Sequence, residues 1–376
     1  MKHFRAEQVL RWVYERGVID PNAMSDLALR EREMLAREMT FASGSIVATQ
    51  SASDGTRKLL IEWDEQPSRE ARAIEHHKTS ASLPILGAPD STAGTGALQT
   101  ECVMIPSLPE SPGRPRRTAC ISSQVGCPVG CKFCASGIGG LDGNLSTGRI
   151  VEQVWRLQRL LAGDAIERGE NAASAWLDNR ITNVVFMGMG EPLANFRAVT
   201  GAVRTLAAPW GMGISARRIT ISTVGLPQAI TRLAEELELP VTLALSLHAP
   251  TDEVRRSLIP WAEYTTIEEL LSACHKWFQK TGREVTLEYT LLRGVNDHAE
   301  HAELLAGLAK KLRANINLIR YNEVSGMPFK RPQTDDVREF QRILRERGIN
   351  AHIRASRGRD IAAACGQLRH ESAKAD

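Results

Sequence analysis

The segment from Gly126 to Cys134 constrains this chain more than any other, because it holds three cysteines in the spacing Cys-x3-Cys-x2-Cys. Thiolates this close together suit zinc or an iron–sulfur cluster rather than hard cations. Zinc normally takes four ligands, and no further Cys or His follows the loop at a suitable spacing. Three cysteines instead leave one iron of a [4Fe–4S] cluster open, which is typical of a reactive metal site. Cys127, Cys131 and Cys134 are therefore the predicted metal ligands.

Length and composition indicate a large globular protein without a secretory disulfide framework. The chain has 376 residues, enough for one barrel of ordinary size with a small appendage. Its formal net charge is only +3, so contact with RNA would need local basic patches. The seven cysteines are odd in number and unevenly spaced, and cysteines as dense as those of the loop usually bind metal inside cells. The absence of a signal peptide and of a membrane-spanning apolar run predicts a cytoplasmic protein without membrane contact.

The first part of the chain is helical by its pattern. Apolar residues recur at helical spacing at 4–16 and again at 25–37. These two patterns predict a small helical accessory domain at residues 1–40. Its charged residues indicate a solvated face or a contact with RNA.

Residues 41–118 are predicted to form a linker that contains strands at 58–63 and 100–105. Between these strands, residues 64–99 show neither helical nor strand periodicity, which predicts an exposed, disordered insertion. The linker also contains adjacent histidines and several arginines: His76, His77, Arg114, Arg116 and Arg117. The histidines lack companions at ligand spacing and are predicted to be solvated. The arginines either contact phosphates or keep a proline-rich segment in solution.

Residues 119–376 alternate between short β-branched apolar runs and amphipathic segments, such as the one that carries Ile150, Val154 and Leu157. Each run predicts a strand and each amphipathic segment a helix. Six such units predict an α/β fold, a partial (β/α)6 barrel with a parallel sheet and helices outside it. A seventh strand is predicted at 350–354. The six strands are predicted at 119–124, 181–187, 217–222, 241–247, 285–292 and 315–320.

Several motifs at the ends of these strands resemble one family. They are Ile121–Gly126 before the cysteine loop, and then Met187–Leu193, Leu245–Pro250 and Ala364–Leu368. The cysteine spacing alone is similar to that of radical S-adenosylmethionine (SAM) enzymes in general. Taken together and in this order, the motifs resemble the RlmN/Cfr family of radical SAM adenosine methyltransferases. The resemblance begins partway into the family's N-terminal domain, so we expect that domain to be shortened or reduced here.

The resemblance implies two cofactors, a [4Fe–4S] cluster on the cysteine loop and SAM beside it. Gly190 and Glu191 look like the residues that hold the methionine amino group of SAM, since a glycine allows close backbone approach and a carboxylate accepts from an ammonium group. The other implied SAM contacts are strand-end residues that would be ordinary on their own: Ser222, Ser246, Leu247, His248 and Asn322. Directly before the asparagine this chain has Arg320 and Tyr321, where the family usually has Pro-Trp.

The resemblance also implies the catalytic residues. Cys365 and Cys120 match the family's two catalytic cysteines, and Glu101 matches its proton acceptor. Adenine ring carbons are too weakly nucleophilic to displace a methyl group from SAM directly, and the resemblance implies a radical route that consumes two SAM molecules per turnover. One methylates Cys365, and the other yields a radical that activates this methyl group for attack on adenine. Cys120 then resolves the protein–RNA thioether, which leaves a transient disulfide for reductants to reopen. By its strand pattern alone, Glu101 would be a surface carboxylate.

The resemblance implies 23S rRNA and tRNA as partners, with a one-electron donor such as flavodoxin or ferredoxin, and we expect a monomer. The favoured activity is methylation of adenosine carbon 2 in the peptidyl-transferase region of 23S rRNA and 3′ of the tRNA anticodon. Cfr-like methylation of carbon 8, a zinc-dependent RNA-binding module and a radical SAM enzyme acting on protein are the alternatives. Of the remaining cysteines, Cys274 is predicted to be a core residue and Cys102 has no matched role.

Overall fold

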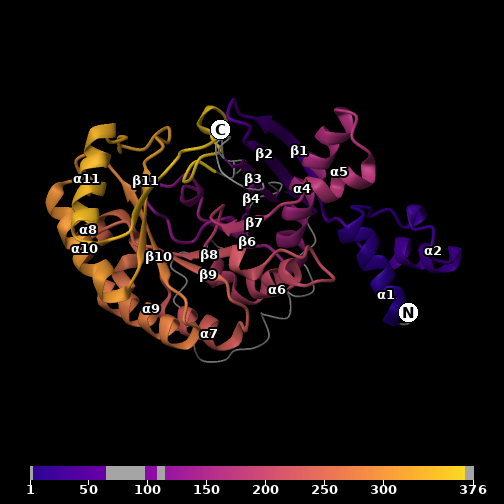
Figure 1. Ribbon diagram of the computed structural model, residues 1–376, viewed down its shortest axis with the longest axis horizontal. Coiled ribbons are helices and arrows are strands. Elements are labelled where there is room, and N and C mark those ends of the chain that lie inside the picture. The colour runs from indigo at the N-terminus through magenta and orange to yellow at the C-terminus, as the bar shows by residue number, and fades with distance from the viewer. Residues whose placement is uncertain (1–2, 65–97, 108–114, 369–376) are drawn as a thin grey trace.

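The structure, a computed structural model, describes residues 3–64, 98–107 and 115–368 (Figure 1). Most of the predicted insertion at 64–99, with both of its histidines, lies outside these residues, as does Arg114. The described residues form an α/β fold around a ten-stranded sheet with the order β1-β2-β3-β4-β7-β8-β9-β10-β11-β12. Its strands are β1 (Gly44–Ser51), β2 (Arg57–Trp63), β3 (Leu98–Pro106), β4 (Arg117–Cys120), β7 (Asn183–Phe186), β8 (Ile219–Thr223), β9 (Thr242–Ser246), β10 (Val285–Leu291), β11 (Asn315–Arg320) and β12 (Ala351–Arg354).

In this sheet, β4 and the strands from β7 to β12 all pair in parallel, which confirms the six predicted strand–helix units and the seventh strand. Parallel neighbours need crossover connections, and these are helices packed along the outer side of the curved, open sheet (Figure 1). The helices of this part are α4 (Thr147–Glu167), α5 (Ala172–Asp178), α6 (Phe196–Ala207), α7 (Pro227–Glu236), α8 (Asp252–Leu258), α9 (Ile267–Thr281), α10 (Ala299–Leu312) and α11 (Thr334–Glu346). The result is the predicted partial barrel, with the carboxyl ends of its parallel strands at one edge.

Strands β1, β2 and β3 extend this sheet in antiparallel pairing. The predicted strands at 58–63 and 100–105 are confirmed, but β3 begins at Leu98, inside the range predicted as insertion. The sequence pattern does not predict β1. Nearly all residues of that strand are exposed, so apolar and polar residues have no reason to alternate along it.

The N-terminal helices are α1 (His3–Leu10), continued by a π-helical turn at Arg11–Glu15, and α2 (Leu29–Glu38). They lie close to the helical patterns predicted at 4–16 and 25–37. They share a small core of their own, made by Val9, Met24, Leu27 and Leu35. The segment after α1 is joined to the barrel by two indole groups: Trp155 Nε1 donates to Val13 O at 2.9 Å, and Trp176 Nε1 donates to Tyr14 O at 3.0 Å.

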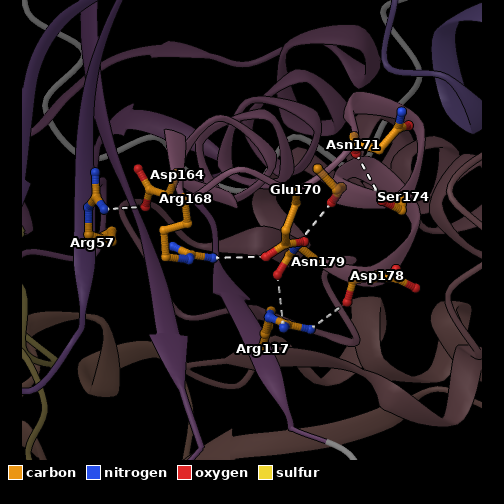
Figure 2. Close-up of polar contacts among 10 residues, drawn as sticks. Arg57, Arg117, Asp164, Arg168, Glu170, Asn171, Ser174, Asp178 and Asn179 are labelled. Atoms are coloured by element: carbon orange, nitrogen blue, oxygen red, sulfur yellow. Dashed lines mark hydrogen bonds and ion pairs between the residues drawn. The ribbon is translucent and has the colours of Figure 1, made fainter. Parts of the chain in front are cut away.

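Polar contacts join β2 to α4, and β4 to the end of α5 and the residue after it (Figure 2). Arg117 of β4 donates from Nη1 to Asp178 O and from Nη2 to Asn179 Oδ1, each at 3.1 Å. Arg57 of β2 forms an ion pair with Asp164 of α4 (Figure 2). Of the linker arginines, Arg117 therefore makes structural contacts, whereas Arg116 is exposed.

The main hydrophobic core lies between the sheet and the outer helices. Cys274 of α9 is fully buried in it, as its helical pattern predicts, and Cys102 of β3 is fully buried there as well. Across the described ranges, none of the helices has both the length and the apolar character needed to cross a lipid bilayer.

Gly17→Ala is expected to destabilise the protein, because Gly17 follows the π-helical turn with φ of +67° and a Cβ there would lie 2.5 Å from Trp176 Cε3. A positive φ costs a residue with a Cβ about 1–2 kcal/mol, and the clash adds to this strain. We expect the free energy of unfolding, measured by denaturant titration, to fall by at least about 2 kcal/mol.

Gly213→Ala is the matched control. Gly213 has a similar φ of +64°, but among the described residues no atom lies within 4 Å of the position its Cβ would take. This variant should lose only the strain contribution. Equal losses in both variants would show that Trp176 does not constrain the segment at Gly17.

Candidate active site

The cysteine loop is held between two short strands, β5 (Gln124–Gly126) and β6 (Leu141–Asn144), which pair as a hairpin. Cys127 N donates to Gly140 O at 2.7 Å directly after β5. Gly126 has φ of +73°, and a Cβ on it would lie 2.0 Å from Gly140 O. Only glycine fits this position, so the turn that opens the loop is set by the sequence.

The three thiols of the loop line one cavity of about 140 Å³ at the carboxyl edge of the sheet. Apolar side chains pack around them, among them Val129, Phe133, Val224, Leu258 and Ile259. Burial raises the pKa of Cys127 to about 12 and also raises the pKa values of Cys131 and Cys134. The free thiols are therefore protonated at neutral pH, and binding of a metal centre must displace their protons.

The loop fits an iron–sulfur cluster better than a zinc ion. Within the described part of the chain, no group of three or more His, Cys, Asp or Glu side chains converges in the way that one metal ion requires. Zinc gathers its ligands around a single point, with sulfur about 2.3 Å from the metal. A cluster takes each thiolate on a different iron, so its ligands surround a wider space. The cavity of about 140 Å³ that all three cysteines line provides such a space.

The turn after β7 lies against the segment that precedes the cysteine loop, and two glycines make this possible. A Cβ on Gly188 would lie 2.7 Å from the carbonyl carbon of Ile121. Gly190 has φ of +97°, and its Cβ would lie 2.6 Å from Gln124 Cβ. Gln124 Oε1 accepts from Glu191 N at 2.8 Å, which fixes the next residue of the turn. Gly190 and Glu191 thus line the same cavity as the cysteines.

The Glu191 carboxylate is buried and faces two backbone donors. Leu193 N donates to its Oε1 at 2.9 Å, and Val224 N donates to its Oε2 at 2.8 Å. Burial nevertheless dominates and raises the pKa of Glu191 to about 7. Each carboxylate oxygen can accept a second hydrogen bond, so Glu191 can also receive an ammonium group from the cavity.

Three more of the predicted SAM contacts line this cavity: Ser222, Ser246 and His248. The hydroxyl groups of Ser222 and Ser246 lie 3.2 Å apart at the ends of β8 and β9. Leu247 is different, because its side chain is fully buried in the main core and is not among the cavity-lining residues.

His248 is held in a conformation that is rare for a residue with a side chain. Its φ is +56°, and its Nδ1 accepts from Thr290 N at 3.0 Å. Asn296 Nδ2 donates to His248 O at 2.7 Å. Burial lowers the pKa of His248 to about 3, so the imidazole is neutral and its proton lies on Nε2. Such strain is maintained only where neighbours enforce it, which is typical of functional sites.

The two remaining cysteines of the site share a second cavity, about 80 Å³ in volume. Cys120 lines it from the end of β4, and Cys365 lines both this cavity and the first. Asn322 also lines the second cavity, and its Nδ2 donates to Cys365 O at 3.2 Å. Arg331 Nη1 donates to Asn322 Oδ1 at 2.9 Å, which fixes the orientation of that amide. The structure therefore brings both cysteines and the asparagine together.

Both of these thiols are protonated at neutral pH. Burial raises the pKa of Cys120 to about 12. Cys365 is exposed to solvent, but desolvation by the protein around its sulfur raises its pKa to about 11. The Arg354 guanidinium opposes both shifts. Arg354 is the cation that favours the thiolate form of each cysteine.

Glu101 is buried, so its interpretation as a surface strand carboxylate is wrong. Its Oε1 lies 2.6 Å from Lys58 Nζ, and Lys58 also donates to Ala362 O at 3.4 Å. Glu101 is not among the residues that line either cavity. It lies on the same face of β3 as Ile105, which does line the second cavity. The sequence pattern does not predict Lys58 as a site residue; its position in a strand beside the buried Leu59 is the available signal.

An ion pair inside the barrel is also missed by the sequence analysis. Glu288 Oε2 lies 3.3 Å from Arg354 Nη1, and Asn317 Nδ2 donates to Glu288 Oε1 at 2.9 Å. Glu288 lines the first cavity and Arg354 the second. A charged residue inside an apolar strand is the signal that could identify Glu288, because such residues are rarely buried without a partner.

Comparison with known proteins agrees with this geometry. The profile of the Radical SAM superfamily matches residues 121–306, so the chain is of the radical SAM class, whose cofactors are a [4Fe–4S] cluster and SAM. The profile described as "Ribosomal RNA large subunit methyltransferase N-terminal domain" matches residues 1–40.

Full-length relatives identify the family within that class. The chain is 42% identical over 370 residues to the probable dual-specificity RNA methyltransferase RlmN of Moorella thermoacetica, with 98% of this chain and 92% of the relative covered. It is 38% identical over 368 residues to the protein of the same description from Rhodopirellula baltica, with 98% and 85% covered. A radical SAM methyltransferase of Sphaerobacter thermophilus has a similar structure, with a TM-score of 0.80, 39% identity and 97% and 92% of the two chains covered. This chain belongs to the RlmN family.

Glu191→Gln is expected to weaken SAM binding to the cluster-loaded protein, because it removes a charge-assisted hydrogen bond worth roughly 1.5–3 kcal/mol. The dissociation constant measured by calorimetry should rise by about one to two powers of ten. The pH dependence gives a second readout. Below its pKa of about 7 Glu191 is protonated and loses its attraction for an ammonium group, so wild-type affinity should rise as pH increases through 7.

The Gln variant serves as its own control for pH, since its affinity should not change over the same range. A wild-type affinity that is independent of pH, or a Gln variant that binds SAM normally, would show that Glu191 only caps the turn through Leu193 and Val224.

Proposed function

We propose that this protein methylates carbon 2 of adenosine in the peptidyl-transferase region of 23S rRNA, and of the adenosine 3′ of the tRNA anticodon, through an S-methylcysteine on Cys365. The observation that carries the proposal is the position of Cys365, which lines both the cavity of the cysteine loop and the cavity of Cys120. A group carried on this sulfur can meet a cofactor on one side and a second thiol on the other. The description of the relatives as dual-specificity RNA methyltransferases supports both RNA substrates.

In this proposal the first cavity holds the cofactors. Cys127, Cys131 and Cys134 would ligate the cluster, and Glu191 with the backbone of Gly190 would hold the amino group of SAM. When bound, these cofactors supply a methyl group and an organic radical. Ser222, Ser246, His248 and Asn322 would orient SAM from the strand ends, and Leu247 would act through its backbone and its packing.

The two thiols of the second cavity would have different tasks. Cys365 receives the methyl group, for which it must lose a proton that its raised pKa retains, and Arg354 favours that loss. Cys120 releases the methylated base by attacking the sulfur of the Cys365–RNA thioether. The sulfur–sulfur bond forms as the sulfur–carbon bond breaks, and the carbon keeps the electron pair and takes up a proton to become the methyl group. The disulfide that remains is reopened by thiol reductants. Glu101 would accept the proton that leaves the adenine ring, from a position on β3 next to the second cavity.

The remaining assignments follow from the same proposal. Residues 1–40 form the accessory domain that helps to bind RNA, residues 41–118 form the linker with its insertion, and residues 119–376 form the catalytic barrel. The protein acts as a monomer in the cytoplasm and receives electrons from a flavodoxin or a ferredoxin. Carbon 8 methylation, the zinc-dependent module and action on protein remain outcomes of the tests below, because no contact among the described residues favours them.

Mass spectrometry of nucleosides tests the substrate directly. RNA from cells with and without the gene should differ by 2-methyladenosine in both 23S rRNA and tRNA. Restoration by the wild-type gene but not by a Cys365→Ala gene would support the proposed carrier. A loss of 8-methyladenosine, or unchanged RNA in both fractions, would contradict the proposal.

Removal of the two thiols should stop the reaction at different points. Cys120→Ala should still become methylated on Cys365 and attack its RNA, but it lacks the thiol that resolves the thioether. It should accumulate as a covalent protein–RNA complex that survives denaturation on a gel. Cys365→Ala should form no such complex, because the carrier sulfur is absent.

Cys274→Ala is the matched control, since it removes a buried thiol from the core without touching either cavity. It should turn over normally. Two results would contradict these roles and leave both cysteines with a role in packing only. One is free methylated RNA from Cys120→Ala at normal yield. The other is a complex that persists in the Cys120→Ala, Cys365→Ala double variant.

A further inference from the structure

Arg255 lies on α8, the helix that packs directly against the cysteine loop. Leu258 O of this helix accepts from Lys132 N at 2.9 Å, between two of the cluster cysteines. Cys131 packs against the same apolar group as Leu258 and Ile259. Arg255 itself is 0% exposed, although arginine is rarely buried without a partner.

The guanidinium group of Arg255 is only partly satisfied by the protein. Its Nη2 donates to Val224 O at 2.5 Å. Within the part of the chain that the structure describes, Nε and Nη1 are buried and have no hydrogen-bond partner. Asp252 is the acidic group that acts on Arg255, but its Oδ1 already accepts from Ile267 N at 2.8 Å. A buried charge with open donors is strongly unfavourable unless an anion completes it.

The charge on Arg255 persists at neutral pH and acts on the site. Burial lowers the pKa of Arg255 only to about 10, so the group remains protonated. Its field opposes the rise in the pKa of Cys131 that burial causes, and after burial it is the second cause of the low pKa of His248. Since α8 packs against the cysteine loop, an anion bound by this loop is a candidate partner for Arg255.

Two anions of the proposed function could complete this group, namely the thiolate-bound cluster and the carboxylate of SAM. Arg255 is not among the residues that line the first cavity, whereas its neighbour Cys131 is. SAM bound in the cavity would therefore contact its lining residues, such as Cys131, and not Arg255 behind them. Three thiolates outweigh the positive charge of the iron–sulfur core, so the cluster is an anion and becomes more negative when it is reduced.

We propose that Arg255 is the buried counter-ion of the iron–sulfur cluster, with Nε and Nη1 as donors toward the sulfur atoms of the occupied site. This inference depends on the proposed function, because it requires a cluster on Cys127, Cys131 and Cys134. Reduction potentials of such clusters depend on net charge and on hydrogen bonds to sulfur. Arg255 thus makes the cluster easier to reduce and helps to retain it. In the cluster-free protein the same unpaired charge lowers stability.

The proposal predicts effects of opposite sign in the two forms of the protein. Arg255→Met removes the charge while it keeps most of the volume. Its cluster-free form should melt at the same temperature as the wild type or higher, because an unpaired buried charge is gone. Its cluster-loaded form should lose iron to a chelator about tenfold faster. In the absence of SAM, its midpoint potential should fall by about 59 mV, which is a tenfold change in the equilibrium of a one-electron couple.

Two further variants complete the experiment. Arg256→Met removes the next arginine of α8, whose side chain is 42% exposed and 4.0 Å from Glu263, and should change neither cluster retention nor potential. Arg255→Lys retains the charge and should restore most of both. Iron release and electron paramagnetic resonance titration report on the cluster without any requirement for methylation activity.

Three results would overturn the inference. If the cluster-free Arg255→Met protein is strongly destabilised while retention and potential of the loaded form are unchanged, Arg255 only supports the loop through Val224. If both cluster properties are unchanged and SAM affinity alone falls, the partner is the SAM carboxylate. If Arg255→Lys fails to restore the potential, the charge is not responsible. A wild-type protein that holds no cluster would instead reject the proposed function itself.

Discussion

The parallel pairing of β4 and the strands from β7 to β12 is the constraint on which the site depends. Parallel strands end at the same edge, so loops that are far apart in sequence meet there. The cysteine loop, the turn with Glu191, the strand ends at Ser222 and Ser246, and the Cys365 loop all reach this edge. A single antiparallel exchange among these strands would send one of these groups to the opposite side of the barrel.

Desolvation sets the chemistry of the groups that meet at this edge. It keeps the thiols of the site protonated, holds His248 neutral and raises the pKa of Glu191 to about 7. The thiols and the imidazole are therefore uncharged, and Glu191 is divided between its two protonation forms near pH 7. Arg255 remains charged although it is buried. Within the described part of the chain, the first cavity is thus surrounded by groups that a cofactor can complete.

The two cavities are connected by residues that lie outside the four sequence motifs. Asn322 connects Arg331 with the backbone of Cys365, and Glu288 with Arg354 spans the interior from one cavity to the other. These contacts join the cofactor side to the side where Cys120 and Cys365 meet. A change in one cavity can therefore alter the position or charge state of the groups in the second.

The sequence by itself determined the fold class, and most of the site residues that it predicts line the two cavities. Strands and helices followed from periodicities of local origin, and Cys127, Cys131 and Cys134 followed from a spacing within one loop. Strand β1 was not predicted, because apolar and polar residues do not alternate along a strand that is exposed on both faces. Only the tertiary structure decided that Glu101 is buried beside Lys58 and that Cys120 and Cys365 share a cavity. It also decided that Nε and Nη1 of Arg255 have no hydrogen-bond partner among the described residues. Burial and electrostatic contacts arise between segments distant in the chain, and no local pattern of residues encodes them.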